Sequence, residues 1–188
     1  MSTSSTRYTT VAIALHWIIA LLIIGQIAGG WYMNHVVESS RAKFGLYQLH
    51  KSFGVLALLV SFGRLYWRLT HKAPALPEGM PAYERIGAQF THIAFYTIMI
   101  GIPLSGWLMV SVSPKEIPTV LFQYIPWPHI PGLPKSELME YISFETHKIV
   151  SYATIALLGL HIGAALKHHI VNKDDVLTRM LPFLKRRT

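Results

Sequence analysis

The feature that most limits the fold of this chain is a set of apolar runs long enough to cross a lipid bilayer. A membrane-spanning helix needs about 20 consecutive, mostly apolar residues. The segments that meet or approach this length are about 11–31, 46–67, 88–112 and 144–167. The second is the weakest, because its uninterrupted apolar stretch covers only 53–63. We therefore predict an all-α integral membrane protein with a single domain, residues 1–188, built as an up-down four-helix bundle.

The amino-acid composition limits the classes of function that this chain can have. Charged residues make up 14% of the chain, whereas soluble domains average about 25%. The formal net charge is +8, and no basic motif is interleaved with aromatic residues as in nucleic-acid-binding proteins. We therefore expect the positive charge to meet anionic lipid and expect no nucleic-acid partner. The chain has no cysteine, which excludes disulfides, cysteine-ligated iron–sulfur clusters and thioether-attached haem.

The distribution of lysine and arginine predicts the orientation in the membrane. Eleven of the 17 such residues fall in the N-terminal segment, the connection after the second run and the C-terminal tail. The positive-inside rule then puts both termini in the cytoplasm, with the chain crossing the membrane several times. The N-terminal segment lacks the basic start of a signal peptide, so we interpret the first apolar run as a retained helix.

Histidines inside the apolar runs are the strongest functional signal, because ionisable groups are costly in lipid and by default mark a functional site. By depth they form two levels, His16 with His161 near the cytoplasmic side and His50 with His147 near the outer side. His147 and His161 are fourteen residues apart, which places them on one helix face. The helical rise separates them by about 21 Å.

Two histidines at one level suit haem iron better than other metals. Zinc usually takes four ligands and copper(I) favours sulfur, whereas haem iron needs two axial ligands because the porphyrin supplies the other four. The outer pair has no rival inside a helix. At the inner level, His92 competes as a ligand. Glycines that would leave room for a macrocycle, or simply allow close helix packing, are Gly25, Gly29, Gly30, Gly54, Gly159 and Gly163.

Six motifs carry a resemblance to a known family: ALHW (14–17), LHKSFG (49–54), GRLYWR (63–68), THK (146–148), GLHIGAALKHH (159–169) and NKDDVLTRM (172–180). Over nearly its whole length the chain resembles the prokaryotic cytochrome b561 family. The resemblance implies a small cytochrome of the bacterial inner membrane with two non-covalent haem b groups, bound at the positions of His16, His50, His147 and His161. It implies no ligand on the third helix, which makes His92 a neighbour of the inner haem. The connection 113–141 matches nothing in the family pattern.

The same resemblance implies a path for single electrons, since members of the family are known as superoxide oxidases that reduce ubiquinone. Lys51 and Lys148 directly follow the outer ligand positions and would attract an anionic donor such as superoxide, or merely reach for the interface. Arg64 and Arg68 lie one turn apart and would pair with haem propionates or anchor the inner end. His168 would bind a quinone carbonyl or relay a proton, or contact a lipid headgroup.

Three functions compete at this point. The first is a self-contained superoxide:ubiquinone oxidoreductase. The second is an electron-transfer subunit that anchors a partner dehydrogenase, with a periplasmic protein docking near Trp127 as one arrangement. The third is a haem-free transporter or structural bundle. We prefer the first and retain the second as the alternative.

Overall fold

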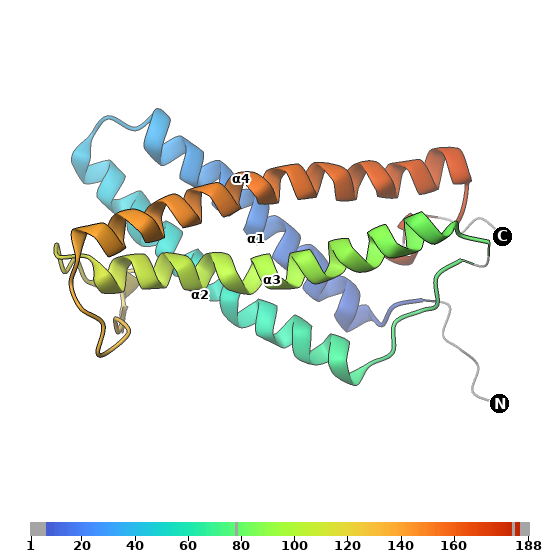
Figure 1. Cartoon of the computed structure of the whole chain (residues 1–188), viewed down its shortest axis with the longest axis horizontal. Coiled ribbons are helices and arrows are strands. Elements are labelled where there is room, and N and C mark those ends of the chain that lie inside the picture. Colours follow the sequence, from blue (N-terminus) through green and yellow to red (C-terminus); the bar gives the residue numbers. More distant parts are fainter. Residues whose placement is uncertain (1–6, 78, 182, 185–188) are drawn as a thin grey trace.

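The computed structural model describes residues 7–77, 79–181 and 183–184, and long helices form its frame. They are α1 (Thr10–His35), α2 (Ser40–Thr70), α3 (Ala82–Val112) and α4 (Glu137–Lys167). Successive helices run in opposite directions (Figure 1), and α1 packs on α2, α2 on α3, and α3 on α4. The predicted all-α, up-down four-helix bundle is therefore confirmed.

Each helix begins before or at the start of its predicted apolar run, because hydroxyl side chains cap the N-termini of three helices. Thr9, Ser39 and Ser136 each accept a hydrogen bond from the backbone N–H three residues later. Such caps satisfy donors in the first helical turn. The helices therefore extend through polar residues that hydropathy alone does not count, most clearly at the start of α2.

Among the described residues, three helices are long and apolar enough to cross a membrane: α1, α3, and α4 together with its continuation to Asn172. α2 does not reach that hydropathy, and its span stays a prediction. The lower hydropathy of α2 agrees with its surroundings, because α2 packs on α1, on α3 and on the connection before α4. Its buried polar residues, Gln48, Ser52 and Ser61, therefore face protein.

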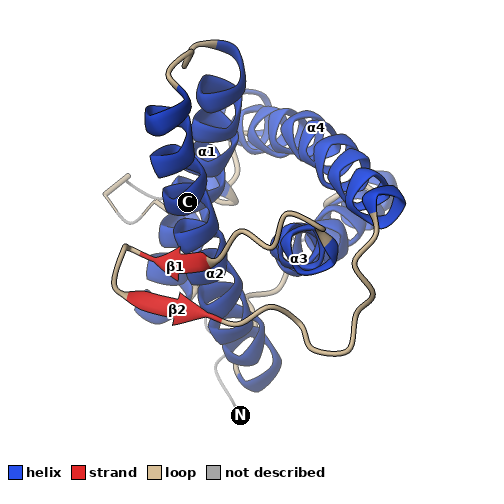
Figure 2. Cartoon of the chain, turned by 90° about the vertical axis from the view of Figure 1, so that its left-hand side faces the viewer, coloured by secondary structure: helices blue, strands red, loops and turns tan. Residues whose placement is uncertain are grey.

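The connection between α3 and α4 contains a short hairpin, which adds a small β element to the helical prediction. Strand β1 (Thr119–Leu121) pairs antiparallel with β2 (Ile125–Trp127), beside the outer end of α2 (Figure 2). Gln48 donates to the carbonyl of Pro118 at 2.9 Å and accepts from the backbone N–H of Val120 at 3.2 Å. Ser52 accepts from the N–H of Phe122 at 2.9 Å. These bonds fix the hairpin on α2.

After α4 the chain folds back across the end of the bundle that holds His16 and His161, which the orientation predicted above makes the inner end. A π-helical turn, His168–Asn172, leads to Lys173, whose φ of 56° is left-handed, and then to a 3-10 turn, Leu177–Arg179. The indole N–H of Trp17 donates to the carbonyl of Met180 at 2.8 Å. The C-terminal segment is thereby tied to α1, one residue from His16.

Candidate functional site

The structure brings the four histidines together in two pairs. His16 of α1 faces His161 of α4, and His50 of α2 faces His147 of α4; in both pairs the ring centroids lie 6.2 Å apart. Two imidazoles bound to one metal ion from opposite sides, through bonds of about 2 Å, would hold their centroids about 6 Å apart. The spacing of both pairs therefore fits a shared ion.

His147 of the predicted outer pair is held in a state that suits metal binding. Nδ1 of His147 lies 3.1 Å from the carbonyl of Ile102 and 2.9 Å from the hydroxyl of Ser105. Because the carbonyl only accepts, Nδ1 carries the hydrogen and the Nε2 lone pair is free. A metal-bound histidine commonly donates its other N–H in this way. The backbone of the facing histidine is also bonded: Gln26 of α1 donates to the carbonyl of His50 in α2 at 2.9 Å.

Glycines line the outer pair closely. A Cβ added at Gly106 would lie 3.3 Å from Cε1 of His147, and one added at Gly30 would lie 3.6 Å from Cε1 of His50. Sequence reasoning named Gly30 but missed Gly106. In the sequence, Gly106 is only a glycine shortly after Pro103 in an apolar run, and this position does not indicate what the glycine contacts.

The inner pair is surrounded by aromatic and basic residues. The ring of Phe95 meets His161 edge-on at 5.2 Å. Nη2 of Arg64 lies 3.2 Å from Nδ1 of His16, and its guanidinium lies 5.9 Å from the ring centre of Tyr96. A guanidinium only donates, so Nδ1 of His16 accepts in this contact. Arg68, one turn later, is exposed.

The donor set fits haem and does not fit a site with several protein ligands. In the part of the chain that the structure describes, no group of three or more histidine, cysteine, aspartate or glutamate side chains is placed to hold a metal. Each level therefore offers two imidazoles, and a single zinc ion would lack ligands. Haem iron needs no third protein donor. His92 interacts electrostatically with both His16 and His161, as a neighbour of the inner level would.

Three lysines near the predicted outer end pair with glutamates. Nζ of Lys148 lies 2.8 Å from Glu145, and two further lysines of this face pair with Glu140 and Glu116. Lys51 instead donates to the backbone carbonyl of Pro118 at 3.2 Å. Of the two lysines singled out in the sequence, Lys51 thus has a neutral partner, whereas the charge of Lys148 is compensated.

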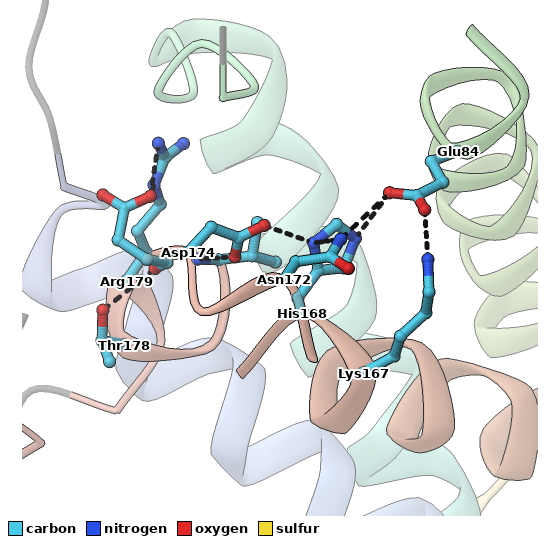
Figure 3. A network of polar contacts seen from close by, with 9 residues as sticks. Glu84, Lys167, His168, Asn172, Asp174, Thr178 and Arg179 are labelled. Carbon is cyan, nitrogen blue, oxygen red and sulfur yellow. Dashed lines mark hydrogen bonds and ion pairs between the residues drawn. The ribbon is translucent and has the colours of Figure 1, made fainter. Parts of the chain in front are cut away.

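At the inner end, His168 lies in a polar network that joins α3 to the C-terminal segment (Figure 3). Its Nδ1 lies 2.5 Å from Oδ2 of Asp174, and its Nε2 lies 3.6 Å from Oε2 of Glu84. Glu84 also pairs with Lys167 and accepts from Asn172. These side chains line a pocket of about 370 Å³ that is also lined by Met80, Pro81 and Tyr83. Sequence reasoning named His168 and missed both carboxylates.

Comparison with known proteins gives concordant matches over most of the chain. The family model described as prokaryotic cytochrome b561 matches residues 7–183. Cytochrome b561 homolog 2 of Escherichia coli (strain K12) is 30% identical over 177 residues, covering 93% of this chain and 91% of that protein. Cytochrome b561 homolog 1 of the same organism is 29% identical, covering 94% and 97%. The probable superoxide oxidase CybB of Yersinia pestis is 25% identical, covering 94% and 96%.

Proposed function

The chain belongs to the prokaryotic cytochrome b561 family, membrane electron-transfer proteins whose cofactor is haem b, and from that premise we propose that it oxidises superoxide at the periplasmic face and reduces ubiquinone. In the balanced reaction, two superoxide anions, one ubiquinone and two protons give two dioxygen molecules and one ubiquinol. The outer histidine pair would then face the periplasm, and both termini would lie in the cytoplasm.

One observation carries this proposal: two facing imidazole pairs with equal spacing at the two ends of one helix. His147 and His161 each meet a partner at 6.2 Å, and the helical rise puts about 21 Å between them. We assign His50 and His147 to the outer haem iron and His16 and His161 to the inner one. Haem, when bound, supplies a one-electron couple at each level.

The residues around the pairs would seat and orient the cofactor. The carbonyl of Ile102 holds His147 by its Nδ1 hydrogen, which directs Nε2 toward the ligand position. Arg64 would turn to a propionate, because an imidazole bonded through Nε2 carries its hydrogen on Nδ1 and no longer accepts from a guanidinium. Arg68, exposed one turn away, is assigned to a second propionate.

At the outer end, Lys51 is our principal candidate for attracting superoxide. Its ammonium donates to a neutral carbonyl, which does not offset its charge, whereas Lys148 is offset by Glu145. A positive group beside the entry point speeds capture of an anionic donor. Support for superoxide itself comes from the name of the Yersinia pestis relative.

At the inner end, we assign the pocket beside His168 to the quinone ring. Its lining combines the imidazole of His168 with the largely apolar side chains of Met80, Pro81 and Tyr83. Small-molecule sites typically combine such an apolar lining with a few placed polar groups. His168 would donate to a quinone carbonyl.

The alternative function is an electron-transfer subunit that passes electrons between a partner dehydrogenase and the quinone pool. The observation in its favour is the hairpin tip, where Tyr124 is 86% and Ile125 59% exposed. Exposed apolar residues next to an outer electron-entry point suit a protein donor.

A spectroscopic experiment separates these functions. The detergent-purified protein is assayed for haem by the pyridine haemochrome method, then given a pulse of superoxide, then ubiquinone. About two haem b per chain, reduced within the pulse and re-oxidised by ubiquinone, is the expected result. Two haems that superoxide does not reduce would refute the enzyme and favour the subunit, and a colourless protein would refute both.

A further inference from the structure

The described residues place His168 between two carboxylates from different parts of the chain. Asp174 follows it by six residues and contacts Nδ1, whereas Glu84 lies in the first turn of α3 and faces Nε2. The side chains of His168 and Glu84 are each 11% exposed, and that of Asp174 is 21% exposed. A charged imidazole with little access to water needs such partners, because desolvation penalises an unpaired charge.

The local backbone is arranged to bring Asp174 back to the histidine. The π-helical turn starts at His168, and Lys173 adopts a left-handed conformation that most residues avoid. The N–H groups of Lys173 and Asp174 both donate to the carbonyl of His168. Asp174 is fixed further, because its Oδ1 accepts from the N–H of Val176 at 3.0 Å. π-Helical turns are frequent at functional sites.

The contact with Glu84 is of a different kind. At 3.6 Å, Oε2 of Glu84 lies beyond hydrogen-bond distance of Nε2. Glu84 is itself held by Lys167 and Asn172 (Figure 3). Nε2 is therefore attracted by a nearby negative charge and still has the capacity to donate to a ligand in the pocket.

We propose that Asp174 and Glu84 are positioning residues for proton delivery from His168 to the quinone. This inference rests on the proposed function and deepens it at the quinone site. Asp174 holds the ring by its Nδ1 hydrogen, so that Nε2 points into the pocket, and both carboxylates stabilise the imidazolium. An aspartate behind a catalytic histidine acts in this way in serine hydrolases.

The proton balance is as follows. The quinone gains two electrons, one from each of two single-electron transfers, and two protons. For each proton, the Nε2–H bond of His168 breaks and an O–H bond forms on the quinone oxygen. This leaves a neutral imidazole that keeps its hydrogen on Nδ1, where the N–H donates to Oδ2 of Asp174. Cytoplasmic water entering the pocket returns a proton to Nε2 before the second transfer.

The other charged and titratable groups around this histidine come from three parts of the chain. Tyr83 and Glu84 belong to α3, Lys167 ends α4, and Asp174 belongs to the C-terminal segment. Asp175 is the neighbour of Asp174, and it pairs with Arg179 at 2.8 Å. The Asp175→Asn substitution therefore makes the same chemical change in the same segment, beside an arginine, and serves as a matched control.

The test is a stopped-flow measurement on the haem-loaded protein. The protein is reduced, mixed with increasing ubiquinone-1, and followed by haem re-oxidation, which gives an apparent Kd for ubiquinone-1 and a limiting rate. Asp174→Asn is expected to lower the limiting rate about 10- to 100-fold, in the range of general-acid contributions, and to change the apparent Kd less than about twofold, because no substrate contact is lost. The solvent deuterium isotope effect on the limiting rate should rise. Asp174→Glu should recover most of the rate, and Asp175→Asn should match the wild type.

Two results would overturn the inference. One is a limiting rate in Asp174→Asn equal to that of the wild type or of Asp175→Asn. The other is a weaker apparent Kd with an unchanged limiting rate, which would mean that Asp174 only shapes the pocket. If Asp174→Asn does not fold with its full haem content, Glu84→Gln makes the same test on the Nε2 side, and a wild-type rate there refutes the proposal. Failure of the wild type itself to be re-oxidised by ubiquinone-1 would instead refute the proposed function.

Discussion

Gly106 offers a test of the outer haem site that does not touch a ligand. In Gly106→Ala the new Cβ would lie 3.3 Å from Cε1 and 3.5 Å from Nδ1 of His147, whereas carbon atoms in favourable contact are about 3.5–4.0 Å apart. The imidazole must therefore move by a few tenths of an ångström. Its bond to the carbonyl of Ile102 is already 3.1 Å long, so this movement takes it toward the limit of hydrogen bonding.

The cost can be estimated from that one bond. A hydrogen bond of this kind contributes about 1 kcal/mol, and its loss corresponds to roughly a fivefold lower affinity for the outer haem. Measured losses of the hydrogen-bond partner of a metal-bound histidine lower metal affinity or activity by about 10- to 100-fold. We therefore expect Gly106→Ala to weaken the outer haem by about 5- to 100-fold. The protein itself should not lose thermal stability, because alanine favours a helix over glycine by about 1 kcal/mol.

Gly101→Ala is the matched control on the same helix. It brings the same gain in helix propensity, but nothing lies within 4 Å of its Cβ. Haem content after detergent washing, together with redox titration of both haems, measures the effect. The reasoning would be refuted if the two alanine variants retained both haems with equal affinity and equal reduction potentials.

Three further predictions test other parts of the molecule. His50→Ala or His147→Ala should remove one of two haems by pyridine haemochrome count, and retention of both in either variant would contradict the outer pairing. Lys51→Glu should slow superoxide reduction of the haem and weaken its salt dependence, as charge steering requires, whereas Lys148→Glu should do less because Glu145 already offsets that charge; equal effects would argue against our choice of Lys51. Gln48→Leu should remove two hydrogen bonds to the hairpin, worth about 1 kcal/mol each, and speed amide exchange at Val120; unchanged exchange would show that the hairpin is held by other contacts.

Much of the helical frame could be predicted because its causes are local. Apolar runs of sufficient length predict helices in lipid, and each predicted segment lies within one observed helix. The histidine levels followed from the same local geometry, since residues fourteen apart share a helix face. The polar first turns were missed, because a cap such as Ser39 depends on a hydroxyl that hydropathy does not weigh.

The weak signal of α2 also has a physical reason. Gln48 and Ser52 lie outside its uninterrupted apolar stretch, 53–63, and the structure gives them partners at the hairpin. Those partners lie about 70 residues further along the chain, in a connection that sequence reasoning did not interpret. Such a residue can be understood only when its partner is known.

By itself the sequence determined the class of fold and the helix order, and it predicted the two histidine levels, because periodicity and hydropathy act within one helix. Its motifs also indicated the family of the chain. Only the tertiary structure decided how those helices rotate against one another. It set Gly106 and Ile102 against His147, whose bonded partner lies 45 residues away, and brought Glu84 to the inner end of α4, 83 residues from Lys167. Contacts of this kind depend on side-chain packing between distant segments, which no local pattern records.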